Sequence, residues 1–287
     1  MRTPEFFLRR TGFYVALLLF CVFAVFPAVW MVITAFKQNA DLYNPNNNPF
    51  LFNLPPTLHH IAYLFTQTNY PIFLWNSFLI GIIVVVITLL LAVPAAYSLA
   101  RLMGHWGEHS SIAIFLVYLI PPTLLFIPLY EIVSTLGLAN TVWSLVLVYP
   151  TITVPFCTWL LLSFFRSIPR DVEEAALTDG WSRVGVFFHV ALPLSVPGIT
   201  TCIVFAFALS LSDYIYAAVF VSATASRTVS AGVPTELIRG DIYYWQALMA
   251  ATAIVGIPLA VVYGLLFDWL VKGFQVELPR RAGAPPA

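Results

Sequence analysis

The sequence contains very little charge. Only 9% of its 287 residues are Asp, Glu, Lys or Arg, whereas 60% are hydrophobic and the mean hydropathy is +0.89. Soluble globular proteins carry roughly 25% charged residues, so this composition cannot supply the polar surface that a soluble domain needs. The net charge is zero, which excludes the basic surface typical of nucleic-acid-binding proteins. We therefore expect no nucleic-acid partner.

The sequence also lacks the motifs of several enzyme and metalloprotein classes. Cys21, Cys157 and Cys202 lie in apolar segments, and their spacing fits neither a disulfide framework nor a metal site. His59 and His60 are expected to be solvated or to pack within a loop. No H-E-x-x-H, no G-x-S-x-G and no Gly-Lys pair of a phosphate-binding loop occurs. We expect no catalytic residue, no metal and no cofactor bound by this chain.

Long apolar runs are what the sequence has instead. Six of them are long enough to cross a bilayer as helices, at about residues 11–36, 74–99, 110–134, 142–165, 194–221 and 246–271. No clean cleavage site follows the first run, so we expect an uncleaved span rather than a signal peptide. The predicted fold class is all-α: a polytopic membrane protein with six transmembrane helices, forming a single transmembrane domain over residues 1–287.

The distribution of Lys and Arg predicts the orientation of these spans. With the N-terminus inside, ten basic residues fall in cytoplasmic segments and three fall outside, namely Lys37, Arg227 and Arg239. Because cytoplasmic loops carry the excess of basic residues, both termini and the loop at about 166–192 are expected in the cytoplasm. The longest outer loop, about 37–73, is crowded with Asn and Pro, which indicates turns rather than regular structure.

Acidic and aromatic residues near the outer ends of the spans are candidates for a substrate pathway. The candidates are Glu131, Asp213, Tyr214 and Tyr216. For Glu131 and Asp213, a structural role and a pathway role are equally compatible with their predicted depth. Membrane-interface anchoring explains the tyrosines as well as sugar stacking does. Asp268, near the inner end of the last span, is expected to be structural.

The stretch "DVEEAALTDG" at residues 171–180 holds four of the 13 acidic residues of the chain. Pro169 and the acids suit the start of a short helix, and Gly180 suits its end. Ser182 can cap a second helix over "RVGVFFHVAL". An inner leaflet repels acidic segments, so a protein partner fits this cytoplasmic loop better than the membrane surface does.

This loop resembles a cytoplasmic motif of permease subunits of bacterial ABC importers: Glu-Ala-Ala, three residues, Gly, nine residues, then Ile-x-Leu-Pro. The matching residues here are Glu174, Ala175, Ala176, Gly180, Leu192 and Pro193, and Val190 replaces Ile. The stretches "WNSFLIG", "AAYSLAR", "IPLYEIVSTLGLANT", "LPLSVPG" and "LVKGF" are similar to the maltose-type sugar permeases. In the fifth span the chain keeps only the acid Asp213 of that family's Trp-Asn-Glu/Asp sequence.

The resemblance implies an inner-membrane permease subunit of an ATP-driven, binding-protein-dependent importer for a carbohydrate, which could be a sugar, an oligosaccharide, a polyol or a glycerol-phosphate compound. The implied partners are two cytoplasmic ATPases that hold ATP and Mg²⁺, a second permease chain in a heterodimer, a periplasmic or lipid-anchored binding protein, and membrane lipid. The implied coupling residues are Glu173, Glu174, Ala175, Ala176, Leu177, Asp179, Gly180, Leu192 and Pro193.

Two other classes of function are weighed against this one. A stand-alone secondary transporter would need acids at the midplane of the membrane for a proton relay, and it often has an inverted repeat; the sequence has neither. An intramembrane enzyme would need a catalytic motif, and none is present.

Overall fold

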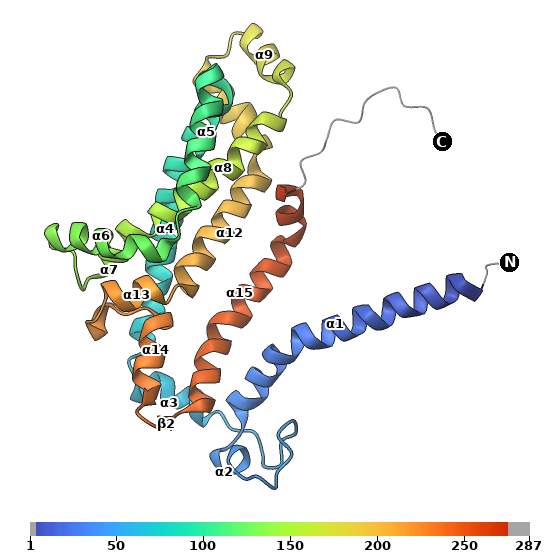
Figure 1. Cartoon of the computed structure of the whole chain (residues 1–287), viewed down its shortest axis with the longest axis vertical. Coiled ribbons are helices and arrows are strands. Elements are labelled where there is room, and N and C mark those ends of the chain that lie inside the picture. Colours follow the sequence, from blue (N-terminus) through green and yellow to red (C-terminus); the bar gives the residue numbers. More distant parts are fainter. Residues whose placement is uncertain (1–3, 275–287) are drawn as a thin grey trace. The chain divides into compact units, whose positions relative to one another are not determined.

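The computed structural model describes residues 4–274, and nearly all of its regular structure is helical (Figure 1). The described part of the chain divides into two compact units. The first holds the residues up to Pro71 together with Val233–Pro258, and the second holds Ile72–Gly232 together with the residues from Leu259 onward. The prediction of a single transmembrane domain remains a prediction.

The first unit contains a long apolar helix and several short segments that follow it or precede the last helix. Its elements are α1 (Pro4–Phe36), α2 (Asn39–Leu42), α3 (His59–Gln67), the end of α14 (Val229–Leu237), the strands β1 (Ile238–Arg239) and β2 (Ile242–Tyr243), and the first half of α15 (Trp245–Phe274). The two strands form an antiparallel hairpin in which Ile238 pairs with Tyr243 and Arg239 with Ile242. Gly240, with φ +60°, supplies the left-handed conformation that its turn requires.

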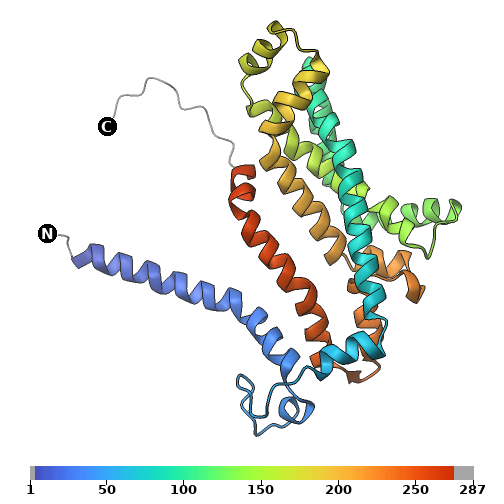
Figure 2. The same cartoon turned by 180° about the vertical axis from the view of Figure 1, so that it is seen from behind.

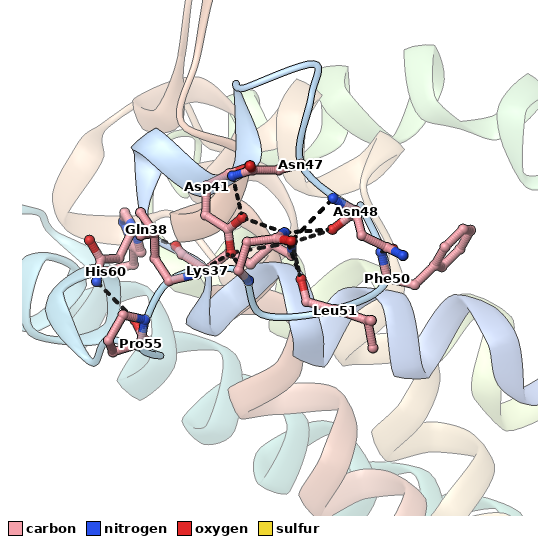
Figure 3. A network of polar contacts seen from close by, with 11 residues as sticks. Lys37, Gln38, Asp41, Asn47, Asn48, Phe50, Leu51, Pro55 and His60 are labelled. Atoms are coloured by element: carbon pink, nitrogen blue, oxygen red, sulfur yellow. Dashed lines mark hydrogen bonds and ion pairs between the residues drawn. The ribbon is translucent and has the colours of Figure 1, made fainter.

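A buried ion pair organises the loop between α1 and α3, which the sequence predicted to lie outside. The side chains of Lys37 and Asp41 are almost fully buried, and Lys37 Nζ lies 3.4 Å from Asp41 Oδ2 (Figure 3). Lys37 also donates to the carbonyl of Asn48 at 3.1 Å. The amide groups of Asn47 and Asn53 donate to Asp41 Oδ1 at 2.9 and 2.8 Å. This loop was predicted to contain only turns; it also holds two short helices around a shared polar core.

The same hydrogen bonds set the acidity of Asp41. Burial raises the pKa of this carboxyl, but hydrogen bonds from Asn53, Leu54 and Asn47 outweigh burial and lower the pKa from 3.8 to about 2. His60 is buried as well, and its Nε2 lies 3.1 Å from the carbonyl of Lys37. Burial lowers the pKa of His60, and this backbone contact opposes the shift only in part. His59 is exposed, as one of the two expectations had it, whereas His60 is packed on helix α3 rather than in an irregular loop.

The second unit is a helical bundle whose chain turns back several times. Its elements are α4 (Tyr70–Tyr97), η1 (Ser98–Leu102), α5 (Gly104–Tyr118), α6 (Pro122–Thr135), α7 (Val142–Val148), α8 (Pro150–Ser167), α9 (Arg170–Thr178), α10 (Arg183–Val186), η2 (Phe187–Ala191), α11 (Leu192–Leu194), α12 (Val196–Ser212), α13 (Ile215–Phe220) and η3 (Thr224–Ser226). The views from both sides show α4, α5, α8 and α12 side by side, with α9 at one end of this bundle (Figures 1 and 2).

Two apolar cores hold the bundle together, one toward each end. The core nearer α9 includes Ala92, Leu161 and Cys202, all fully buried, and the other includes Ile80 and Leu145. Helices α8 and α12 approach closely where Gly198 faces Phe164. A Cβ atom at Gly198 would lie 2.6 Å from the Phe164 ring. A glycine is therefore needed here, in keeping with the small residues typical of helix contacts in membranes.

The predicted spans are largely present as apolar helices. Four helices are long and apolar enough to cross a membrane: Arg10–Phe36, Tyr70–Leu102, Val142–Ser167 and Trp245–Asp268. The count within the described residues becomes six if each of two bent helix pairs is one span. These pairs are Ile112–Tyr118 with Pro122–Thr135, bent by 89°, and Arg183–Leu194 with Val196–Ser212, bent by 73°.

Two spans differ from the prediction of continuous helices. The third, expected over 110–134, is interrupted between Tyr118 and Pro122, because Pro121 and Pro122 supply no backbone N–H and clash with a preceding turn. The fifth was expected to run to Val221, but α12 ends at Ser212 and a separate short helix begins at Ile215. The carboxylate of Asp213 accepts backbone hydrogen bonds from this next helix, which stabilises the break.

Candidate functional site

The predicted coupling helix is present as α9, and its end has a defined geometry. The helix begins after Pro169, and Asp171 and Glu173 occupy its first turn, where the helix dipole favours negative charge. At the other end Gly180 adopts φ +92°. The amide of Gly180 donates to the carbonyl of Leu177, and that of Trp181 to the carbonyl of Ala176, both at 3.1 Å. This is the Schellman arrangement, in which glycine reverses the chain at a helix end.

Glu173 attaches α9 to the end of the second span. Its Oε1 lies 2.7 Å from Arg101 Nε, and its Oε2 accepts a hydrogen bond from the Tyr97 hydroxyl at 3.2 Å. Arg101 also donates through Nη2 to the carbonyl of Ile168 at 2.7 Å. Glu173 is only 7% exposed. One arginine therefore joins η1, the end of the fourth span and the coupling helix.

Glu174, by contrast, is exposed and has no hydrogen-bond or ion-pair partner within the described part of the chain. Ala175, Leu177 and Asp179 are exposed as well, and Ala176 is half-buried. We define the coupling surface as four exposed residues among those that the family resemblance implied for coupling: Glu174, Ala175, Leu177 and Asp179. Beside it lies a cavity of about 180 Å³, lined by Glu173, Glu174 and Leu177 and by Arg101, Arg170 and Arg183.

The second half of the loop leads the chain back into the fifth span. The Ser182 hydroxyl accepts a hydrogen bond from the amide of Gly185 at 3.1 Å, so the predicted cap of the second helix is confirmed. The chain remains helical through η2 and α11, which carries Leu192 and Pro193. It then bends by 73° into α12. Leu192 packs against the core near α9, which links this loop to the spans.

The substrate-pathway candidates lie on neighbouring elements but do not converge. Asp213 Oδ2 accepts hydrogen bonds from the Tyr149 hydroxyl at 3.2 Å and from the amides of Tyr216 and Ala217 at 3.0 and 3.2 Å. Tyr216 is 1% exposed, and its hydroxyl donates to the carbonyl of Pro122. These contacts stabilise the broken fifth span. Helix α6, which carries Glu131, packs against α13.

Glu131 and Tyr214 are both exposed. Within the described residues, no hydrogen bond joins either side chain to the Asp213 carboxylate, so hydrogen bonds do not join the four candidates into one site. The contacts of Asp213 and Tyr216 favour a structural role, which was one of the two alternatives for the acid. Their role in a substrate pathway stays a prediction.

Sequence reasoning did not single out Arg101 or Tyr97 as partners of the coupling helix. Both residues belong to the stretch "AAYSLAR", which contributed only to the family resemblance. Arg101 is the single basic residue in its predicted cytoplasmic segment. This was the one feature of the sequence that could have marked it as a partner for an acidic residue. The Lys37–Asp41 network gave no comparable signal, because its amide donors lie up to 12 residues from Asp41.

The sequence matches the family described as "binding-protein-dependent transport system inner membrane component" over residues 76–276. This range contains the coupling helix, most of the second span and all of the later spans. The chain belongs to this family. The permease is thus a transport subunit of a binding-protein-dependent system of the inner membrane.

Curated relatives cover nearly the whole permease. The sulfoquinovosyl glycerol transport system permease protein SmoH of Agrobacterium fabrum is 34% identical over 94% of this chain and 93% of its own. The inner membrane ABC transporter permease protein YcjP of Escherichia coli is 30% identical over 95% of this chain and 97% of its own. The trehalose/maltose permease MalG of Thermococcus litoralis is 28% identical over 93% of this chain and 95% of its own.

The fold of the permease also occurs in a solved transporter. A chain of a bacterial ABC transporter that imports the acidic polysaccharide alginate superimposes with a TM-score of 0.79 and 18% identity, over 94% of this chain and 99% of that one. The same kind of transporter in complex with its pentasaccharide-bound periplasmic protein gives a TM-score of 0.62 and 14% identity, over 93% and 92% of the two chains. The all-α permease fold predicted from the sequence is confirmed.

Proposed function

We propose that the permease belongs to an ATP-driven importer of a carbohydrate, and that the coupling surface on α9 is where it contacts an ATPase. The names of several relatives refer to sugars or sugar glycerides, which supports the substrate class. The observation that carries the coupling role is the contrast between two adjacent glutamates, one buried and one exposed. Glu173 is buried against Arg101, while Glu174 stands exposed beside small alanines.

This geometry suits the transmission of movement between a partner and the spans. A helix that was fixed only by its own loop could tilt without moving the membrane helices. Here Glu173 links α9 to the end of α4 through Arg101, and Leu192 links the other half of the loop to the core. A partner that displaces the coupling surface would therefore move the inner ends of spans two and five together. Gly180 ends α9, and Pro193 lies in α11, where the loop leads into the fifth span.

The partners follow from the same proposal. Two cytoplasmic ATPases would hold ATP and Mg²⁺, because the sequence has no Gly-Lys pair of a phosphate-binding loop. A second permease chain would complete a heterodimer, and a periplasmic or lipid-anchored binding protein would deliver the carbohydrate. The excess of basic residues supports cytoplasmic termini and a cytoplasmic coupling surface.

The first experiment is purification of the tagged permease in mild detergent, followed by assays of its subunits and of ATP hydrolysis. We expect an ATPase and a second permease to co-purify, and ATP hydrolysis to support carbohydrate uptake in proteoliposomes. Glu174→Lys and Gly180→Pro should leave the chain inserted but abolish coupled uptake. A permease that purifies alone, even after crosslinking, and transports without ATP would instead be a stand-alone transporter.

A further inference from the structure

A second cavity, of about 260 Å³, lies within the first unit and is lined by none of the residues assigned above to coupling or to a substrate pathway. Its walls come from residues 39–63, between α1 and the end of α3, and from residues 242–247, which form β2 and the start of α15. Four tyrosines belong to these walls: Tyr43, Tyr63, Tyr243 and Tyr244. So many aromatic side chains around one small cavity are typical of a ligand site.

The tyrosines are held in place by contacts between the two walls. The rings of Tyr63 and Tyr244 stack with centroids 5.9 Å apart and an angle of 13° between their planes. The Tyr43 hydroxyl donates to the carbonyl of Tyr243 at 3.2 Å. Tyr43, Tyr243 and Tyr244 nevertheless remain more than one-third exposed. Their rings are therefore ordered and yet accessible to a molecule that enters the cavity.

Gln246 supplies the observation that points to a ligand. The side chain lines the cavity and is 2% exposed, and its amide nitrogen has no hydrogen-bond partner among the described residues. Burial of an unpaired amide costs free energy, so natural proteins keep few of them. Anchoring at the membrane interface accounts for exposed tyrosines, but it does not account for an unpaired buried amide beside them.

The lining defines the chemistry of the ligand. Among the described residues, no Lys, Arg, Asp or Glu lines this cavity, so these residue types offer no partner to an ionic ligand. Aromatic rings stack on the apolar faces of sugar rings, while amides, imidazoles and tyrosine hydroxyls pair with hydroxyl groups. Ligand pockets usually measure ~300–1,000 Å³. This cavity, at about 260 Å³, is slightly smaller than that range, so it suits one ring rather than an oligosaccharide.

We propose that this cavity is a subsite for a single neutral sugar ring, with the Gln246 amide donating to a ring hydroxyl and the tyrosines packing on the ring. The inference rests on the carbohydrate function proposed above. Under the predicted orientation the cavity lies at the outer surface, where a sugar first meets the permease.

The test uses the assembled transporter in nanodiscs, without its binding protein, and the methyl glycosides of glucose, galactose, mannose and xylose as probes. Binding is measured by saturation-transfer NMR. Gln246→Leu removes the amide at similar volume. We expect at least one glycoside to bind, and Gln246→Leu to weaken its binding roughly tenfold. The unfolding temperature should stay equal or rise, because an unpaired buried amide has been removed.

Two further variants localise the effect. Gln67→Leu makes the same change on α3, at an exposed position that does not line the cavity, and should bind as the unaltered chain does. Tyr63→Phe should retain binding because it keeps the stacked ring, whereas Tyr63→Ala should weaken it. Equal affinity in Gln246→Leu and the unaltered chain, or no signal with any glycoside, would overturn the proposal.

Carbohydrate uptake in cells separates this inference from the proposed function. If cells import a carbohydrate through the transporter and the cavity variants bind and transport normally, only the subsite is wrong. If no carbohydrate in a broad panel is taken up and none binds, the carbohydrate function itself is wrong. Uptake that is slowed by Gln246→Leu but not by Gln67→Leu supports both the carbohydrate function and the sugar subsite.

Discussion

At the scale of single residues, Glu173 and Glu174 illustrate how neighbouring carboxylates take different roles. Glu173 points to Arg101 and Tyr97, and its ion pair with Arg101 is nearly buried. Removal of one partner from a buried pair leaves an uncompensated charge, which typically costs ~3 kcal/mol. Glu174 has no such partner and is exposed. The two residues are therefore expected to respond differently to the same substitution.

We predict that Glu173→Ala detaches α9 from the bundle, whereas Glu174→Ala does not. A loss of ~3 kcal/mol corresponds to amide hydrogen exchange about a hundredfold faster in residues 170–178. Mass spectrometry of deuterium uptake measures this directly. Glu174→Ala should leave the rates within roughly twofold. Equal acceleration in both variants would refute the anchoring role of Glu173.

Asp41 gives a prediction for the pH dependence of the outer loop. Its pKa is lowered from 3.8 to about 2 in the folded state, so its contribution to stability is present above about pH 4. That contribution is lost as the pH falls from about 4 to about 2, because the folded carboxylate then becomes protonated. We expect pepsin to cleave residues 43–54 faster across this window, with rates normalised to an unstructured peptide.

Asp41→Asn serves as the control for this measurement. It cannot form the ion pair with Lys37 at any pH, so its normalised cleavage should be fast and nearly independent of pH. The same pH profile in both chains would assign the effect to another carboxylate.

At the scale of elements, the end of the coupling helix depends on one glycine. Gly180 adopts φ +92°, where a residue with a Cβ is strained by about 1 kcal/mol. We predict that Gly180→Ala frays the end of α9, with roughly fivefold faster amide exchange there, and slows ATP-driven uptake. Gly264→Ala is the matched control, because it lies inside α15 and a Cβ would meet nothing within 4 Å. Equally slow uptake in Gly264→Ala would show that the slower uptake of Gly180→Ala does not come from strain in the turn at Gly180.

Sequence reasoning predicted the elements better than their interruptions. Hydropathy finds apolar runs whether or not they are continuous helices, so it located the third and fifth spans but not their breaks. The break after Ser212 depends on hydrogen bonds that Asp213 accepts from the next helix and from Tyr149. Tyr149 lies 64 residues away in the sequence. The helix α9 and the caps at Gly180 and Ser182 were predictable because their determinants are local. The pairing of Glu173 with Arg101 joins residues 72 positions apart, and no local pattern encodes it.

At the scale of the whole molecule, the permease exposes large apolar surfaces on its own. Phe20, Phe23 and Leu265 are at least 70% exposed, which a soluble protein would avoid. Lipid covers such helices in the membrane, and the proposed second permease would cover part of the same surface. The permease therefore needs its membrane to cover the apolar surface that the chain leaves exposed, and the proposed second permease would share in this.

The orientation in the membrane is the prediction on which the proposed function depends most. Ten basic residues against three favour cytoplasmic termini, which places α9 inside and the β-hairpin outside.

Single cysteines at Thr178→Cys and Asp241→Cys, both at exposed positions, report on the two sides. Cys21 is replaced by Ala, whereas Cys157 and Cys202 are fully buried and can stay. A membrane-impermeant maleimide should label Asp241→Cys in intact spheroplasts and Thr178→Cys only after permeabilisation. The reverse pattern would place the coupling surface beyond the reach of any cytoplasmic ATPase, and the proposed coupling role could not hold.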